Sequence, residues 1–204
     1  RRAAAPPASS PSARIPPPFP VPAMPTVSIL STGYEVLRGF TPNTNATWLA
    51  RRTTEAGAEV VAMRTVGDAL PDLDRALREA LAEASCVLVT GGLGPTEDDR
   101  TREALAEVAG VALVEDPRAW AIVAAWFARA GRTPTAMQRR QGRVPTGFEP
   151  LPNAQGTAPG LAGRVGDRRV FLLPGPPREM RAMFDAAALP RWRSDAGFVE
   201  AAAR

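Results

Sequence analysis

The sequence predicts an α/β fold, a three-layer α/β/α domain built on a mostly parallel sheet. Three observations lead to this fold class. Short apolar stretches typical of buried strands alternate with longer amphipathic stretches typical of helices from residue 26 onward. The first strands are each separated by enough residues for one helix, as parallel strands require. Glycine or aspartate follows several strands, where the chain leaves the sheet.

The predicted elements follow one another in a regular order. Expected strands cover residues 27–31, 59–66, 85–89, 148–151, 161–165 and 169–173, and expected helices cover residues 44–56, 100–109, 119–130 and 133–141, with two more starting at 68 and 175. Asn43 or Thr44 caps the first helix. Asp68 caps the second, whose leucines recur on one face. Asp116 followed by Pro117 is a cap and first turn for the helix at 119–130.

Residues 26–189 form the predicted domain, and a segment flanks it at each end. Residues 1–25 are rich in Pro, Ala and Arg without a hydrophobic period, so we expect them to be disordered. Residues 190–204 are expected to be a C-terminal tail, with Trp192 exposed beyond the last helix as part of an interface. No apolar run approaches the roughly 20 residues that span a bilayer, and we expect a cytoplasmic protein.

Two residue types are missing from the sequence, and their absence removes several classes of active site. There is no His and no Lys, so all 25 basic residues are Arg. This excludes a Ser-His-Asp triad, a His-ligated zinc site, a Schiff-base lysine and a Walker-type phosphate loop. The single Cys86 lies in an expected buried strand and cannot form a metal cluster. The groups that remain for catalysis and ligand binding are therefore carboxylates, hydroxyls, Arg, backbone amides and a hard, oxygen-ligated cation.

The formal net charge of +4 raises the question of nucleic acid as a partner. The arginines are scattered along the chain, and no segment interleaves them with aromatic residues as a stacking surface requires. We therefore do not expect nucleic-acid or membrane binding.

A glycine-rich loop follows the expected strand at 85–89. It contains Thr90, Gly91, Gly92, Gly94, Pro95 and Thr96 and leads into a helix. Glycines let the backbone approach a ligand closely, and a helix start favours an anion, so the loop suits a phosphate group. A tight strand-to-helix turn without a ligand is the alternative interpretation.

Two adjacent carboxylates, Asp98 and Asp99, come directly after this loop. Carboxylates beside an anion site require a cation, and a divalent metal ion of the magnesium type can bridge carboxylate and phosphate oxygens. We expect one of the two to cap the following helix and the other, Asp99, to face the ligand. Asp68, close to Asp99, would complete a pair that holds a metal ion or activates water. The candidate catalytic residues are Asp68, Asp98 and Asp99, with Asp68 and Asp99 as metal ligands.

Four further loops add candidate binding residues. They supply Gly33, Glu35, Asn43, Asn45, Thr157, Gly175 and Pro176. Carboxylate and amide side chains can accept or donate hydrogen bonds to a nucleotide-like ligand, although turn and capping roles fit the asparagines equally well. Ligands of open α/β sheets bind beyond the carboxyl ends of the strands, so we expect these loops to meet at one edge of the sheet.

Six motifs in this order resemble one family. They are Gly33-x-Glu35, Asn43-Thr44-Asn45, Val66-Gly67-Asp68, the block at 90–99, the segment at 153–160 and Leu173-Pro174-Gly175-Pro176-Pro177. Over residues 26–189 the sequence is similar to the N-terminal domain of the CinA competence/damage-inducible proteins, a branch of the MoaB/MogA-type molybdopterin-binding fold. Tyr34 departs from the family pattern, which has a smaller polar residue there.

The resemblance implies a metal-dependent pyrophosphatase that cleaves ADP-ribose to AMP and ribose 5-phosphate. The glycine loop and Arg-rich surroundings would hold the diphosphate. In the molybdopterin branch, aspartates at the positions of Asp68 and Asp99 act at the phosphate end of the pterin. The alternative is therefore a molybdopterin-binding or nucleotidyl-transfer domain related to MoaB/MogA in molybdenum cofactor biosynthesis.

Two other expectations follow from the resemblance. Relatives of both branches suggest a homo-oligomer. The sequence ends at Arg204, before the separate domain that removes the amide of nicotinamide mononucleotide in this family, so we expect no amidase activity. A non-catalytic module whose partner protein carries the activity is a third interpretation.

Overall fold

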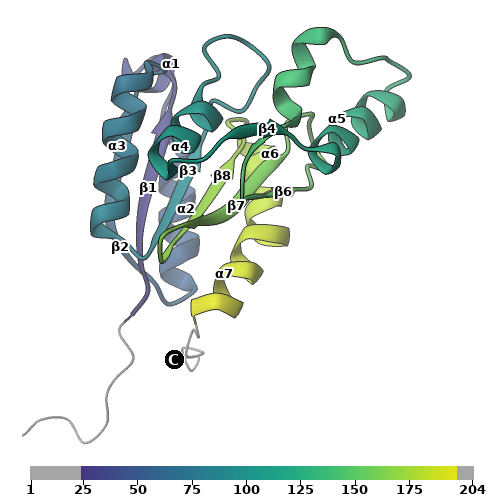
Figure 1. Ribbon diagram of the computed structural model, residues 1–204. Helices are drawn as coiled ribbons and strands as arrows, with labels where there is room; N and C mark the ends of the chain where they lie inside the picture. Colours follow the sequence, from purple (N-terminus) through teal and green to yellow (C-terminus); the bar gives the residue numbers. More distant parts are fainter. Residues whose placement is uncertain (1–23, 197–204) are drawn as a thin grey trace, which may run out of the picture.

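The structure is a computed structural model of the 204-residue chain and describes residues 24–196. The segment 1–25, predicted to be disordered, lies outside the described residues except for Met24 and Pro25. Residues 197–204 of the predicted tail also lie outside them. Within the described part, strands and helices alternate along the chain (Figure 1).

Six strands form the central sheet. They are β1 (Thr26–Thr32), β2 (Glu59–Val66), β3 (Cys86–Thr90), β6 (Glu149–Leu151), β7 (Gly160–Val165) and β8 (Arg168–Leu173), in the order β2-β1-β3-β8-β7-β6. β1 pairs in parallel with β2 and β3, and β3 pairs in parallel with β8. β7 runs antiparallel to β8 and β6 because only Gly166 and Asp167 separate it from β8, too few residues for a crossover. The sheet is therefore mostly parallel, as predicted.

Helices cover both faces of this sheet (Figure 1). They are α1 (Tyr34–Leu37), α2 (Thr44–Glu55), α3 (Leu70–Glu83), α4 (Thr101–Ala109), α5 (Pro117–Arg129), α6 (Pro177–Met183) and α7 (Leu189–Ala196), with a 3-10 helix at Ala136–Gly142 and a π-helix at Phe184–Ala188. β4 (Leu113–Glu115) and β5 (Arg143–Pro145) form a separate antiparallel pair. No helix in this part of the chain is long and apolar enough to cross a membrane. The sequence did not predict α1, β4 or β5, which have three or four residues each and show no hydrophobic period.

Two apolar clusters hold the layers together. Leu49 of α2 and Phe184 of the π-helix pack in one cluster, and Leu77 of α3 and Leu105 of α4 pack in the other. The neighbouring residues Ile29 and Leu30 of β1 belong to different clusters because successive strand residues point to opposite faces. A parallel sheet is apolar on both faces, which confirms the predicted three-layer architecture.

Local capping signals predicted two of the helix starts correctly. The Asn43 side chain accepts a hydrogen bond from the Ala46 N–H at 3.0 Å and begins α2. Asp116 accepts from the N–H groups of Arg118 and Ala119 at the start of α5. Each cap satisfies backbone donors that the first helical turn leaves without a partner.

The C-terminal part of the domain extends further than predicted. The chain continues from α6 through the π-helix into α7, which carries Trp192 back against the sheet. Trp192 is only 2% exposed and belongs to the same core cluster as Phe184. The prediction of an exposed Trp192 beyond the last helix is therefore wrong, and α7 is part of the folded domain.

Replacing Trp192 by alanine tests this packing. We expect Trp192→Ala to lower the free energy of unfolding by about 3–5 kcal/mol, because it removes a large buried ring and leaves a cavity. Phe40→Ala is the matched control, since Phe40 is 78% exposed and its removal should change the free energy by no more than about 0.5 kcal/mol. Urea titrations measure both values, and equal effects of the two changes would contradict the burial of Trp192.

Candidate functional site

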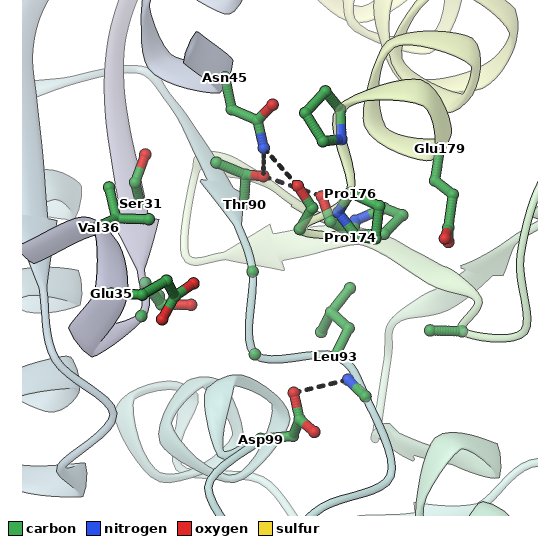
Figure 2. A pocket seen from close by; sticks show the side chains of 18 of the residues that line it. Ser31, Glu35, Val36, Asn45, Thr90, Leu93, Asp99, Pro174, Pro176 and Glu179 are labelled. Carbon is green, nitrogen blue, oxygen red and sulfur yellow. Dashed lines mark hydrogen bonds between the residues drawn. The ribbon is translucent and has the colours of Figure 1, made fainter. Parts of the chain in front are cut away.

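A cavity of about 530 Å³ lies at the carboxyl ends of β1, β3 and β8 (Figure 2). Its volume is within the usual range for sites that bind nucleotide-sized ligands. The predicted residues that line it are Gly33, Glu35, Asn43, Asn45, Asp68, Thr90, Gly91, Gly92, Gly94, Pro95, Asp98, Asp99, Thr157, Gly175 and Pro176. Thr96 is the one predicted residue outside the lining, and its hydroxyl contacts Asp98 and Asp99. The loops therefore meet at one sheet edge.

The glycine-rich loop after β3 folds so tightly that side chains do not fit. Gly91 and Gly92 have positive φ angles of 104° and 64°, which residues with a side chain rarely adopt. A Cβ atom on Gly94 would lie 2.3 Å from a carboxylate oxygen of Asp99. The hydroxyl of Thr101, at the start of α4, donates to the Gly91 carbonyl at 3.0 Å and ties the loop to the helix.

Asp99 closes this loop and also lines the cavity. Its carboxylate accepts hydrogen bonds from the Gly94 N–H at 2.8 Å, the Thr96 N–H at 2.9 Å and the Thr96 hydroxyl. The same hydroxyl contacts Asp98, and this hydrogen bond lowers the pKa of Asp98. The residue before α4 is Arg100, whose side chain makes no capping bond. The prediction that one of the two aspartates caps α4 is therefore wrong, because the amides of the glycine loop hold Asp99 instead.

Asp68 occupies the strand end next to this acidic group. It accepts a hydrogen bond from the Tyr34 N–H at 3.2 Å, whereas Ala69 is the residue that precedes α3. The prediction that Asp68 caps α3 is wrong, because α1 brings a competing backbone donor to its side chain. Burial raises the pKa of Asp68, and the negative charges of Glu35, Asp98 and Asp99 raise it further, against the opposing effect of the Tyr34 N–H.

The opposite wall is built by hydrogen bonds between three elements (Figure 2). Asn45 of α2 donates to the Thr90 hydroxyl at 3.0 Å and to the Gly175 carbonyl at 2.7 Å. The Thr90 hydroxyl in turn donates to the Pro174 carbonyl at 2.9 Å. These bonds hold α2, the end of β3 and the loop after β8 together, so Asn45 has a structural role in shaping the cavity. Because its amide nitrogen faces the Gly175 carbonyl, its amide oxygen is left without a partner in the described part of the chain.

Sequence reasoning missed several residues of the lining, including Thr32, Gln141 and Glu179. Gln141 donates to the Thr157 hydroxyl at 3.0 Å, and Glu179 accepts from Asn153 at 2.7 Å. A signal for Glu179 existed, since it lies in the first turn of a helix that starts at a strand end. Gln141 comes from the 3-10 helix and does not follow a strand of the central sheet, and no local pattern indicates it.

The charged residues of this lining are all acidic. They are Glu35, Asp68, Asp98, Asp99 and Glu179, and no arginine of the described residues contributes to the wall. The prediction that arginines hold the diphosphate is therefore not supported by the residues that line this wall. Many arginines instead pair with surface carboxylates, as Arg52 does with Asp185. The described residues also contain no group of three or more acidic, His or Cys side chains arranged to hold a metal ion.

Comparisons with known proteins agree with this geometry. Residues 28–194 match the family described as "Probable molybdopterin binding domain". The CinA-like protein of Myxococcus xanthus is 41% identical over 168 residues, which are 82% of this chain and 40% of that protein, so the chain spans about two fifths of this relative.

Solved structures show the same fold. The crystal structure of the protein CinA with unknown function from Thermoplasma acidophilum is 35% identical, with a TM-score of 0.76 over 82% of this chain and 98% of that one. The molybdopterin biosynthesis enzyme MoaB from Thermus thermophilus is 27% identical, with a TM-score of 0.55 over 85% of this chain and 98% of that one. Together they confirm the predicted resemblance.

The close approach of Asp99 to Gly94 can be tested by a single methyl group. We expect Gly94→Ala to lower the free energy of unfolding by about 1–3 kcal/mol, because the new Cβ forces the carboxylate away from the loop amides. Gly142→Ala is the control, since its Cβ would meet no atom closer than 3.4 Å, and it should leave stability unchanged or slightly higher. Urea titration compares them, and a Gly94→Ala chain as stable as the Gly142→Ala chain would refute the tight contact.

The raised pKa of Asp68 predicts a pH-dependent effect of Asp68→Asn, which keeps an oxygen for the Tyr34 N–H but removes the charge. The raised pKa means that deprotonation weakens folding, and this loss begins as the pH rises past the ordinary value of 3.8. At neutral pH we expect the variant to be more stable than the wild type by up to about 1 kcal/mol, because solvent screens a half-buried carboxylate. At about pH 3 the difference should vanish. Urea titrations without added metal check this, and a less stable variant at neutral pH would contradict the sign.

Proposed function

We propose that this chain, which belongs to the molybdopterin-binding domain family and to its CinA-like branch, is a metal-dependent pyrophosphatase. Its proposed substrate is a nucleotide sugar of the ADP-ribose type. The observation that supports the proposal is a nucleotide-sized cavity whose glycine loop suits phosphate, yet whose charged residues are all carboxylates. A diphosphate brings further negative charge to this wall. A bound divalent cation would offset the repulsion between the carboxylates and the diphosphate.

The residues of the cavity fit such an ion. Magnesium prefers oxygen ligands and commonly binds one or two carboxylates together with phosphate oxygens of the substrate. Asp68 is the first candidate ligand, because only one backbone N–H occupies its carboxylate. Asp99 is the second, although three hydrogen bonds from the loop already use much of its capacity as an acceptor. The described residues contain no cluster of three or more acidic, His or Cys side chains that could hold a metal ion, so phosphate oxygens of the substrate would have to complete the ligand set.

The protein's own groups would orient the diphosphate. The N–H groups of Gly92 and Leu93 make no hydrogen bond within the described part of the chain, and both residues line the cavity. Backbone amides in a glycine loop are suitable donors to phosphate oxygens. A bound divalent ion would supply charge neutralisation and a water of lowered pKa. Addition of water to the phosphorus–oxygen bridge gives AMP and ribose 5-phosphate.

Incubation with ADP-ribose and magnesium, manganese or cobalt tests the proposal, with AMP followed by chromatography. We expect the wild-type chain to form AMP only with metal. Asp68→Asn should lower the rate by about 100-fold or more, because it removes a charged metal ligand while keeping the hydrogen bond to Tyr34.

Asp72→Asn is the matched control, since Asp72 lies on α3 outside the cavity lining and pairs with Arg75. It should leave the rate of AMP formation unchanged. Intact ADP-ribose with every metal would refute the pyrophosphatase. AMP formed equally fast by the Asp68→Asn chain would keep the activity but remove Asp68 from the metal site.

The family description and the likeness to MoaB favour a second candidate, the binding of molybdopterin or nucleotidyl transfer to it. Both ligands carry a flat heterocycle and phosphate, so the same cavity can serve either. A titration with molybdopterin distinguishes them. Tight binding of the pterin by a chain that does not cleave ADP-ribose would support this candidate over the first.

A further inference from the structure

A guanidinium group is buried directly beneath the glycine loop. Arg102 lies in the first turn of α4 and is only 2% exposed, and it is not part of the cavity lining. Arginine is rarely buried without a compensating partner, because removing its charge from water is costly. Arg102 therefore requires a physical explanation that the catalytic proposal does not supply.

The partners of Arg102 are neutral. Its Nη1 group donates to the Leu93 carbonyl at 3.0 Å, and its Nη2 group donates to the Pro159 carbonyl at 3.4 Å. Within residues 24–196 it forms no salt bridge, and its Nε group has no partner. The neighbouring Glu103 pairs with Arg140 instead, at 3.0 Å. Burial lowers the pKa of Arg102 to about 10, so it still carries its charge at neutral pH.

Arg102 and Asp99 hold the same peptide group from opposite sides. The peptide between Leu93 and Gly94 has its carbonyl bonded to Arg102 and its N–H bonded to Asp99 at 2.8 Å. In a trans peptide these two groups point in opposite directions, so the two bonds fix the orientation of the plane. Asp99 lies at the end of the loop itself and Arg102 lies in the first turn of α4, so the bond from Arg102 ties the loop to the helix.

The second bond of Arg102 reaches another wall of the cavity. Pro159 follows Thr157 and Ala158, which line the cavity. The same loop is also held by Gln141, which donates to the Thr157 hydroxyl, and by Glu179, which accepts from Asn153, but neither of these bonds reaches the glycine loop. Arg102 thus connects the glycine loop with the loop at 153–160 through one planar, forked side chain.

We propose that Arg102 is a positioning residue that holds both loops in place and that its positive charge is compensated by the anion bound on the other side of the glycine loop. The positioning part depends only on the described contacts. The compensation part rests on the proposed function, in that the bound ligand is a diphosphate.

Hydrogen exchange on the free, full-length chain tests the positioning part. We expect Arg102→Met to speed amide exchange by about tenfold in both loops, at 90–99 and at 153–160, with unchanged exchange in β1 and β3. Arg75→Met is the control, because it removes the same charge from an exposed site on α3. Unchanged exchange in either loop, or the same change in the control, would overturn this part. If the methionine variant does not fold, Arg102→Lys, which lacks the fork, should still speed exchange in at least one loop.

Calorimetric titration with magnesium and inorganic pyrophosphate tests the compensation part. We expect Arg102→Met to bind about tenfold more weakly than the wild type, and Arg75→Met to bind as well as the wild type. Arg102→Lys should bind progressively more weakly as the pH rises from about 7 to about 9, because burial lowers the pKa of a lysine into this range, while the wild type stays constant. A merely structural role would not produce this pH dependence.

The outcomes separate the two proposals. Equal affinity of Arg102→Met and the wild type would overturn the compensation. A wild type that binds pyrophosphate but leaves ADP-ribose intact would refute the hydrolysis alone. A wild type that binds no pyrophosphate would overturn the compensation, and the exchange data would still decide whether Arg102 positions the loops.

Discussion

In the ladder that joins β1, β3 and β8, Ser31 lies opposite Thr90, and Thr90 lies opposite Leu173. Three parallel strands therefore end at the same level, and three separate connections leave the sheet side by side. Each brings polar groups to one cavity: α1 and α2 after β1, the glycine loop after β3, and the start of α6 after β8. If this register shifted, the bonds of Asn45 to Thr90 and Gly175 could not both form.

Asp68 and Asp99 also accept hydrogen bonds from backbone N–H groups that lie outside α3 and α4, and for this reason they do not cap these two helices. The N–H groups at the start of α4 and those of the glycine loop compete for the same nearby carboxylates. Asp99 bonds to the loop, at Gly94 and Thr96, and α4 begins without a side-chain cap. A carboxylate held by two backbone donors has little freedom, which would favour the metal binding that we propose for it.

The sequence predicted the layers and the meeting of the loops because both depend on strong, local patterns. Buried strands such as Cys86–Thr90 and helices capped by Asn43 are recognisable from neighbouring residues alone. The partner of Asp68 is not, because Tyr34 lies 34 positions away and only the fold brings its N–H near. Trp192 was misjudged for a related reason: the helical path continues through a π-helix after α6 and returns the ring to the core. The number of arginines in the sequence, likewise, does not indicate where each side chain lies, which is why it could not show whether arginines line the cavity.

The two sides of the glycine loop carry charges of opposite sign. On the open side Asp68, Asp98 and Asp99 repel a bare anion; burial raises the pKa of Asp68, and the charges of Glu35, Asp98 and Asp99 raise it further. On the closed side Arg102 places a cation behind the same backbone. The ligand that we propose, a diphosphate with a divalent cation, would suit both sides, because the carboxylates would attract the cation and the loop amides would bind the phosphates. Under this proposal the charge distribution of the site would favour the diphosphate with its cation over the free diphosphate, which the carboxylates would repel.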